Sequence, residues 1–105
     1  MNTVSLFKQN GKYFGFSSQG HAGKGNAGND VVCAAISESV RYTANLLEAF
    51  SHQVEVKVNE KKAEITVSVS HPNANSEAIF ATFLSEIRLI REEYPKYITI
   101  HITEV

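Results

Sequence analysis

The 105-residue chain contains no tryptophan, one cysteine, one methionine and two prolines. A single cysteine cannot form an internal disulfide, so Cys33 is either a small packing residue or a thiol kept for its chemistry. No stretch approaches the roughly eighteen consecutive apolar residues of a membrane-spanning helix. The N-terminal residues also lack the basic leader, apolar run and cleavage site of a secretion signal. We therefore expect a soluble, cytoplasmic protein with no membrane segment.

The chain also lacks a strong charge of either sign. Ten basic and eleven acidic residues give a net charge of -1. Such a balance provides no overall field that favours nucleic acid or an anionic membrane. The length and the 43% hydrophobic content suit one domain with its own core, over residues 1–105, and are too small for two ordinary domains.

Hydrophobic periodicity predicts five strands and two helices. Alternating or β-branched residues indicate strands near residues 3–7, 13–16, 54–58, 65–69 and 98–102. Apolar residues three or four apart predict two helices, one after Asp30 and one that starts at Asn73 to Ser76 and ends before Pro95. Their inward faces are formed by Val32, Ile36, Val40, Thr43, Leu47 and Phe50, and by Ile79, Phe80, Phe83, Leu84, Ile87 and Ile90. The order ββαββαβ predicts an α+β fold in which two helices pack on a mixed five-stranded sheet.

The segment between the second strand and the first helix contains the candidate chemistry. Residues 20–28 include four glycines, which favour an irregular loop. Asp30 can cap the following helix, which makes Cys33 its third residue. Free N–H groups and the helix dipole stabilise a thiolate in the first helical turn. His21 lies twelve residues earlier, and the glycines permit the chain to bring its ring to the sulfur.

This pair of residues predicts a cysteine protease. His21 would take the thiol proton, Cys33 would attack a peptide carbonyl, and the imidazolium would then protonate the leaving amine. Backbone N–H groups near Cys33 would form the oxyanion hole. Asp30 has two open roles, which are capping the helix and orienting His21. Ser37, one turn after Cys33, either lines the substrate pocket or is simply solvated.

Two rival interpretations remain open. Residues 23–28 read GKGNAG, a G-x-G-x-x-G pattern that indicates phosphate binding, but a dinucleotide fold needs repeated parallel βαβ units that the predicted order lacks. A non-catalytic binding module is the other alternative, with Cys33 as a packing residue. The other histidines, His52, His71 and His101, have no metal-ligand spacing, so we expect neither a metal nor a cofactor.

The motifs resemble those of a known family. Residues 20–22 (GHA), 28–37 (GNDVVCAAIS) and 92–95 (EEYP), in their order along the whole chain, resemble the ribosomal-processing cysteine protease family, Prp. The resemblance implies a catalytic dyad of His21 and Cys33, accompanied by Asp30.

The resemblance also implies a substrate and a partner. Members of the family are cytoplasmic homodimers that remove a short N-terminal extension from a large-subunit ribosomal protein, cutting after an aromatic pair, a step needed for ribosome assembly. The glycine loop would be a mobile flap over the substrate, and the flap positions in this sequence are Gly20, Ala22, Gly23 and Gly28. No cofactor, direct nucleic-acid contact or membrane contact is implied.

Overall fold

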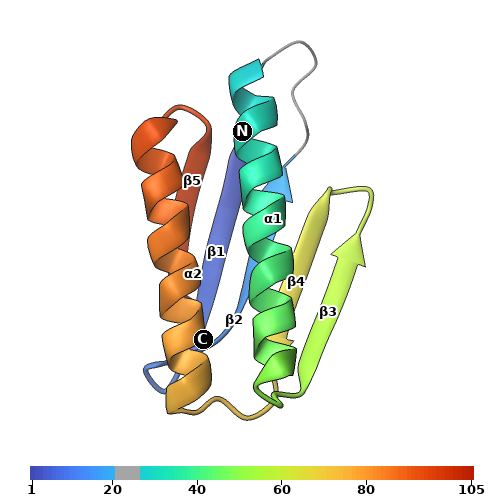
Figure 1. The fold of residues 1–105 in the computed structure, drawn as a ribbon, viewed down its shortest axis with the longest axis vertical. Helices are drawn as coiled ribbons and strands as arrows, with labels where there is room; N and C mark the ends of the chain where they lie inside the picture. The colour runs from blue at the N-terminus through green and yellow to red at the C-terminus, as the bar shows by residue number, and fades with distance from the viewer. Residues whose placement is uncertain (21–26) are drawn as a thin grey trace.

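The computed structural model describes residues 1–20 and 27–105, which form five strands and two helices in the predicted order (Figure 1). Their bounds are β1 Asn2–Gln9, β2 Lys12–Gly20, α1 Ala27–Ala49, β3 Val54–Asn59, β4 Glu64–Val69, α2 Ala74–Glu93 and β5 Ile98–Glu104. The first hairpin turns at Asn10 and Gly11, whose positive φ angles of 53° and 77° match the twist of the paired strands.

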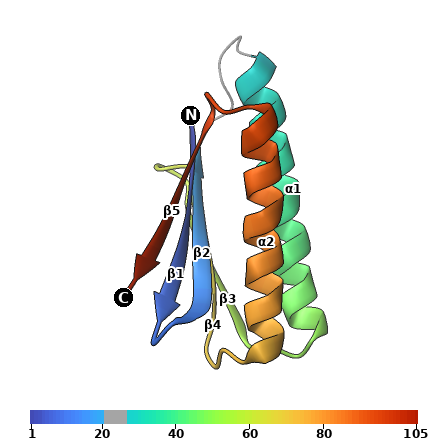
Figure 2. The same ribbon diagram turned by 90° about the vertical axis from the view of Figure 1, so that its left-hand side faces the viewer.

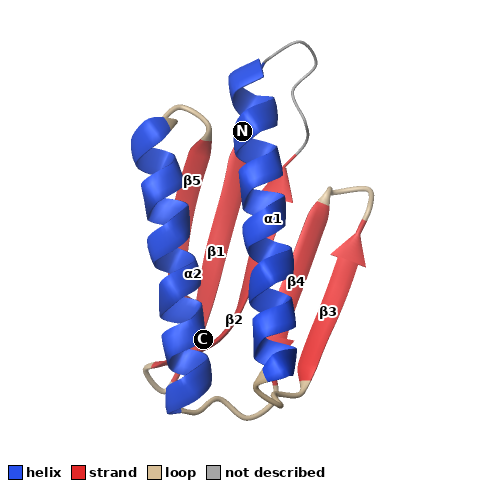
Figure 3. Cartoon of the chain, viewed as in Figure 1, coloured by secondary structure: helices blue, strands red, loops and turns tan. Residues whose placement is uncertain are grey.

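The strands form one mixed sheet in the order β3-β4-β2-β1-β5 (Figure 3). The neighbouring strands pair antiparallel, except that β1 pairs with β5 in parallel, from Asn2↔Ile98 to Lys8↔Glu104. The first and last strands of the described chain are therefore adjacent. This pairing brings the residues just before β5 close to the beginning of β1.

Both helices lie on the same face of the sheet, as Figure 2 shows. The core between the two layers includes Phe16 of β2, which stacks on Phe83 of α2 with ring centroids 4.1 Å apart. The predicted inward positions of both helices are buried, except for two. Ile90 is partly buried against the core, and Phe50 is 56% exposed because α1 ends at Ala49.

The beginning of α1 differs from the prediction. The helix begins at Ala27 and has 23 residues, so Asp30 lies within its first turn and does not cap it. Gly28 is the second residue of the helix, and Gly20 is the last residue of β2. The predicted loop is thus shorter at both ends than residues 20–28, because tertiary contacts described below order its flanks.

The other helix begins as its sequence predicts. Asn73 is the N-cap of α2, and its side-chain oxygen accepts a hydrogen bond from the backbone N–H of Ser76. The Ser76 hydroxyl accepts in return from the backbone N–H of Asn73, which completes a capping box.

The two helices leave part of the sheet face uncovered. Figure 1 shows β3 beside α1, with no helix of the described chain over it. Val58 of β3 pairs with Ile65 of β4, which pairs with Ser18 of β2, so these residues share one face. It is the face that packs against the helices, because Phe16 and Val67, two positions along, are buried in the core.

Candidate active site

Cys33 is the seventh residue of α1 and is partly buried. The prediction that it is the third residue is wrong. The N–H groups without a partner inside the helix belong to its first turn, and the effect of the helix dipole falls off within that turn. Cys33 therefore lies beyond the turn in which the helix end acts most strongly.

Of the residues proposed to assist Cys33, the structure describes Asp30 and Ser37 but not His21. Asp30 is exposed in the first turn of α1, where a carboxylate interacts favourably with the positive end of the helix dipole. His21, Ala22 and Gly23 lie outside the described residues, so their predicted roles are not visible here. Ser37 is exposed, four residues after Cys33 and therefore on the same side of α1.

A buried polar network fixes the beginning of α1. Asn29, which is 3% exposed, accepts hydrogen bonds at its Oδ1 from Asn2 Nδ2 at 3.1 Å and from the Met1 backbone nitrogen at 3.0 Å. The side chain of Asn2 also donates to the Tyr97 carbonyl at 3.2 Å, and its backbone N–H donates to the same carbonyl at 2.8 Å. The network joins β1, the first turn of α1 and the segment before β5. Sequence reasoning missed it, since no local pattern relates asparagines 27 positions apart.

Gly20 and Gly28 are close-contact positions beside this network. A Cβ atom on Gly28 would lie 2.8 Å from Cε2 of Tyr97, and one on Gly20 would lie 2.2 Å from Oδ1 of Asn2. Both distances are shorter than any ordinary contact, so a side chain at either position would displace its neighbour. The structure thus gives both glycines a packing role, in contrast to the loop predicted around them.

A cavity of about 470 Å³ opens on the same side of α1 as Cys33. Its lining residues come from α1, β2 and β4, and they are Ser18, Ala34, Ser37, Glu38, Val40, Arg41 and Ile65. Ser37 lies about 6 Å along the helix axis from Cys33, which is four residues at 1.5 Å each. Ala34, the residue directly after Cys33, also lines the cavity, so the cavity begins within one helical turn of Cys33.

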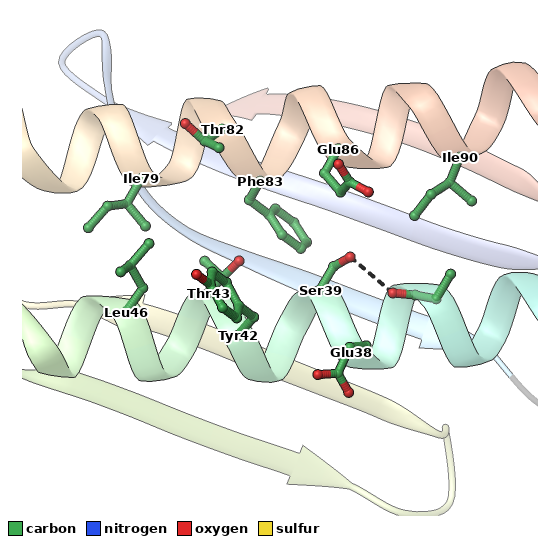
Figure 4. Close-up of a pocket in the computed structure, with 11 residues that line it drawn as sticks. Glu38, Ser39, Tyr42, Thr43, Leu46, Ile79, Thr82, Phe83, Glu86 and Ile90 are labelled. Carbon is green, nitrogen blue, oxygen red and sulfur yellow. Dashed lines mark hydrogen bonds between the residues drawn. The ribbon is translucent and has the colours of Figure 1, made fainter.

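A second cavity, of about 450 Å³, lies between the two helices (Figure 4). Ile79, Phe83 and Ile90 point into it from α2, and Leu46 points into it from α1. Tyr42, which also lines it, is nine residues from Cys33, and at about 100° per residue that places it on the opposite side of α1. This second cavity is therefore separate from the thiol.

Residues 1–20 and 27–105 contain no group of three or more His, Cys, Asp or Glu side chains arranged to hold a metal ion. Within the same residues, neither helix has the length and apolar character to cross a membrane.

Known structures share this fold. SMU.848 from Streptococcus mutans is 25% identical, with a TM-score of 0.86 over 100% of this chain and 96% of that one. The essential ribosomal processing protease Prp from S. aureus, crystallised with a substrate peptide, is 24% identical, with a TM-score of 0.87 over 98% of this chain and 100% of its own. The structure of the same S. aureus protease with a covalently linked product peptide is also 24% identical in sequence. It has a TM-score of 0.84 over 98% of this chain and 100% of its own.

Comparison with curated proteins found no match. The family model described as cysteine protease Prp, in contrast, matches residues 1–99, which is nearly the whole chain and includes both Cys33 and His21. The chain is therefore a member of the cysteine protease Prp family.

Proposed function

We propose that the protein is a site-specific cysteine endopeptidase that removes the N-terminal extension of a large-subunit ribosomal protein during ribosome assembly. The observation that carries the proposal is the match to the cysteine protease Prp family over residues 1–99, which contain the only cysteine of the chain. The partial exposure of Cys33 supports a reactive thiol more than a purely structural one. The S. aureus relative is described as a ribosomal processing protease.

The proposed mechanism uses Cys33 and His21. The imidazole of His21 takes the thiol proton, and the thiolate sulfur attacks the scissile carbonyl carbon. As the C–N bond breaks, the imidazolium returns the proton to the leaving amine, which leaves a thioester on Cys33. Water, deprotonated by the same imidazole, then hydrolyses the thioester and releases the acid and the free thiol. Backbone N–H groups near Cys33 would stabilise the oxyanion.

The decisive test is incubation of the purified protein with the precursor ribosomal protein, followed by mass measurement of the products. Cys33→Ala is expected to abolish cleavage, and His21→Ala to lower kcat/KM by about 10²–10⁴-fold. His71→Ala is the matched control, because His71 is exposed in the loop before α2 and is expected to leave the rate unchanged.

A normal rate of cleavage by Cys33→Ala would overturn the proposal. Failure of native Cys33 to react with iodoacetamide, together with absence of cleavage, would instead favour a non-catalytic ribosome-associated binding module.

We further propose that the protein acts in the cytoplasm as a homodimer. A reducing compartment keeps the Cys33 thiol available. Tyr42 on α1 is 67% exposed and Leu89 on α2 is 56% exposed, and removal of such apolar surface from water would favour association of two copies.

A further inference from the structure

The side chain of Asn2 lies between the two parts of the fold that carry the proposed dyad. His21 directly follows Gly20, the last residue of β2. Cys33 follows Asn29 by four residues, which is about 6 Å along α1. Asn2 lies against Gly20 and donates a hydrogen bond to Asn29. One buried side chain therefore contacts both the strand that leads to His21 and the helix that carries Cys33.

The contact with Gly20 requires that residue 20 has no side chain. Asn2 and Gly20 are directly paired across β1 and β2, and a Cβ atom on Gly20 would lie 2.2 Å from Oδ1 of Asn2. The amide of Asn2 therefore occupies the space that a side chain at position 20 would fill. It lies against the backbone at the point where β2 ends and the chain continues to His21.

Hydrogen bonds fix the orientation of the Asn2 amide. An asparagine side chain has two N–H donors, and Nδ2 of Asn2 donates to Asn29 Oδ1 at 3.1 Å and to the Tyr97 carbonyl at 3.2 Å. The same carbonyl accepts a hydrogen bond from the backbone N–H of Asn2 at 2.8 Å. Because Asn2 is 2% exposed and Asn29 is 3% exposed, rotation of the amide would break these bonds where water does not replace them.

We infer that Asn2 is a positioning residue for the proposed reaction, and that it sets the placement of the end of β2, which leads to His21, relative to the helix that carries Cys33. The inference rests on the proposed function and gives Asn2 no part in the covalent steps. Correct placement of a base and a nucleophile supplies a large part of catalysis, and a misplacement of about 1 Å can cost about a hundredfold in rate. Gly20 and Asn29, the two residues that Asn2 holds, both belong to the described chain.

The first test is the reaction of Cys33 with iodoacetamide, which needs no substrate. Iodoacetamide alkylates the thiolate, which forms in the proposed mechanism when His21 takes the thiol proton. Asn2→Leu keeps the approximate shape of the side chain and removes both donors. It is expected to lower the alkylation rate at neutral pH about tenfold, and to have no effect in a His21→Ala background. This dependence on His21 distinguishes positioning from a general loss of stability.

The second test is cleavage of the precursor. Asn2→Leu is expected to lower kcat about tenfold with KM nearly unchanged, because the substitution affects proton transfer and not substrate binding. Asn73→Ala is the matched control, since it removes the N-cap side chain of α2 and also lowers stability. Figure 1 shows that α2 begins at the opposite end of the molecule from the beginning of α1. Asn73→Ala is therefore expected to keep the wild-type kcat and alkylation rate.

Two substitutions at Asn29 test the same hydrogen bond from its other side. Asn29→Leu removes the acceptor of the Asn2 amide and is expected to lower kcat and the alkylation rate as Asn2→Leu does. Asn29→Asp keeps an acceptor in the first turn of α1, where the helix dipole favours a negative charge. It is expected to keep both rates within about twofold of wild type, because a carboxylate accepts a stronger hydrogen bond than an amide.

The outcomes separate this inference from the proposed function. If the wild-type protein does not cleave, or if Cys33→Ala cleaves normally, the proposed function is wrong, whereas the alkylation rates still test the role of Asn2. Equal alkylation rates for Asn2→Leu and Asn73→Ala, or an equal loss with and without His21, would show that Asn2 supports only the fold. If Asn2→Leu does not fold, the variants of Asn29 decide, and equal rates for Asn29→Leu and Asn29→Asp would overturn the positioning role.

Discussion

At the scale of single residues, Asn29 anchors the first turn of α1, the helix that carries Cys33, to the beginning of β1. It lies one helical turn before Cys33, and its buried side-chain oxygen accepts hydrogen bonds from the first two residues of the chain. Loss of that acceptor leaves the buried side-chain amide of Asn2 without one of its partners, which costs more than the hydrogen bond itself contributes. Asn29 therefore helps to fix the turn of α1 that precedes Cys33, the proposed nucleophile.

We therefore expect Asn29→Ala to lower the free energy of unfolding by about 1–3 kcal/mol. Asn45→Ala is the matched control, because Asn45 is exposed in the same helix and the substitution brings the same gain in helix propensity. Urea denaturation of both variants measures the difference. Equal stability of the two variants would show that the network contributes nothing to the fold.

At the scale of elements, the capping box of α2 makes a measurable contribution to the free energy of unfolding. Asn73→Ala removes the acceptor that bonds the Ser76 N–H at 3.0 Å, and we expect a loss of about 0.5–2 kcal/mol. Thermal unfolding checks this, with Ser85→Ala on the exposed side of the same helix as a control that should leave the midpoint nearly unchanged. A midpoint for Asn73→Ala equal to that of Ser85→Ala would contradict the prediction.

The two helices also show how much the sequence can predict. The inward faces were predictable because burial follows the helical period, and the beginning of α2 was predictable because its cap is local. The beginning of α1 was not predictable, since Gly28 and Asn29 are poor helix residues in isolation. The ring of Tyr97 against Gly28 and the side chain of Asn2 against Asn29 stabilise that first turn, and both contacts are remote in sequence.

At the scale of the whole molecule, the sheet order β3-β4-β2-β1-β5 could not be read from the chain. Hairpins are local, so the pairings of β1 with β2 and of β3 with β4 follow from the turns between them. The pairings of β1 with β5 and of β2 with β4 depend on packing of the helices. For the same reason the uncovered part of the sheet was not predictable, because it exists only where β4 and β3 extend beyond α1.

The proposed homodimer is also tested at this scale. Light scattering is expected to give twice the 11.6 kDa mass of one chain, since exposed Tyr42 and Leu89 would lose water on association. A single-chain mass at every concentration up to the solubility limit would overturn the proposal. Tyr42→Glu, if it lowers the mass to that of one chain, would place the interface on the helix layer.

The parallel pairing of β1 with β5 has a consequence for protein synthesis. Strand β5 and Tyr97 are translated after every other element of the fold, yet Tyr97 supplies the carbonyl that holds Asn2 and the ring that packs on Gly28. A nascent chain that has made only β1 to α2 therefore lacks the contacts that position the first turn of α1. The first turn of α1 should therefore reach its final position only late in synthesis, once Tyr97 and β5 are available.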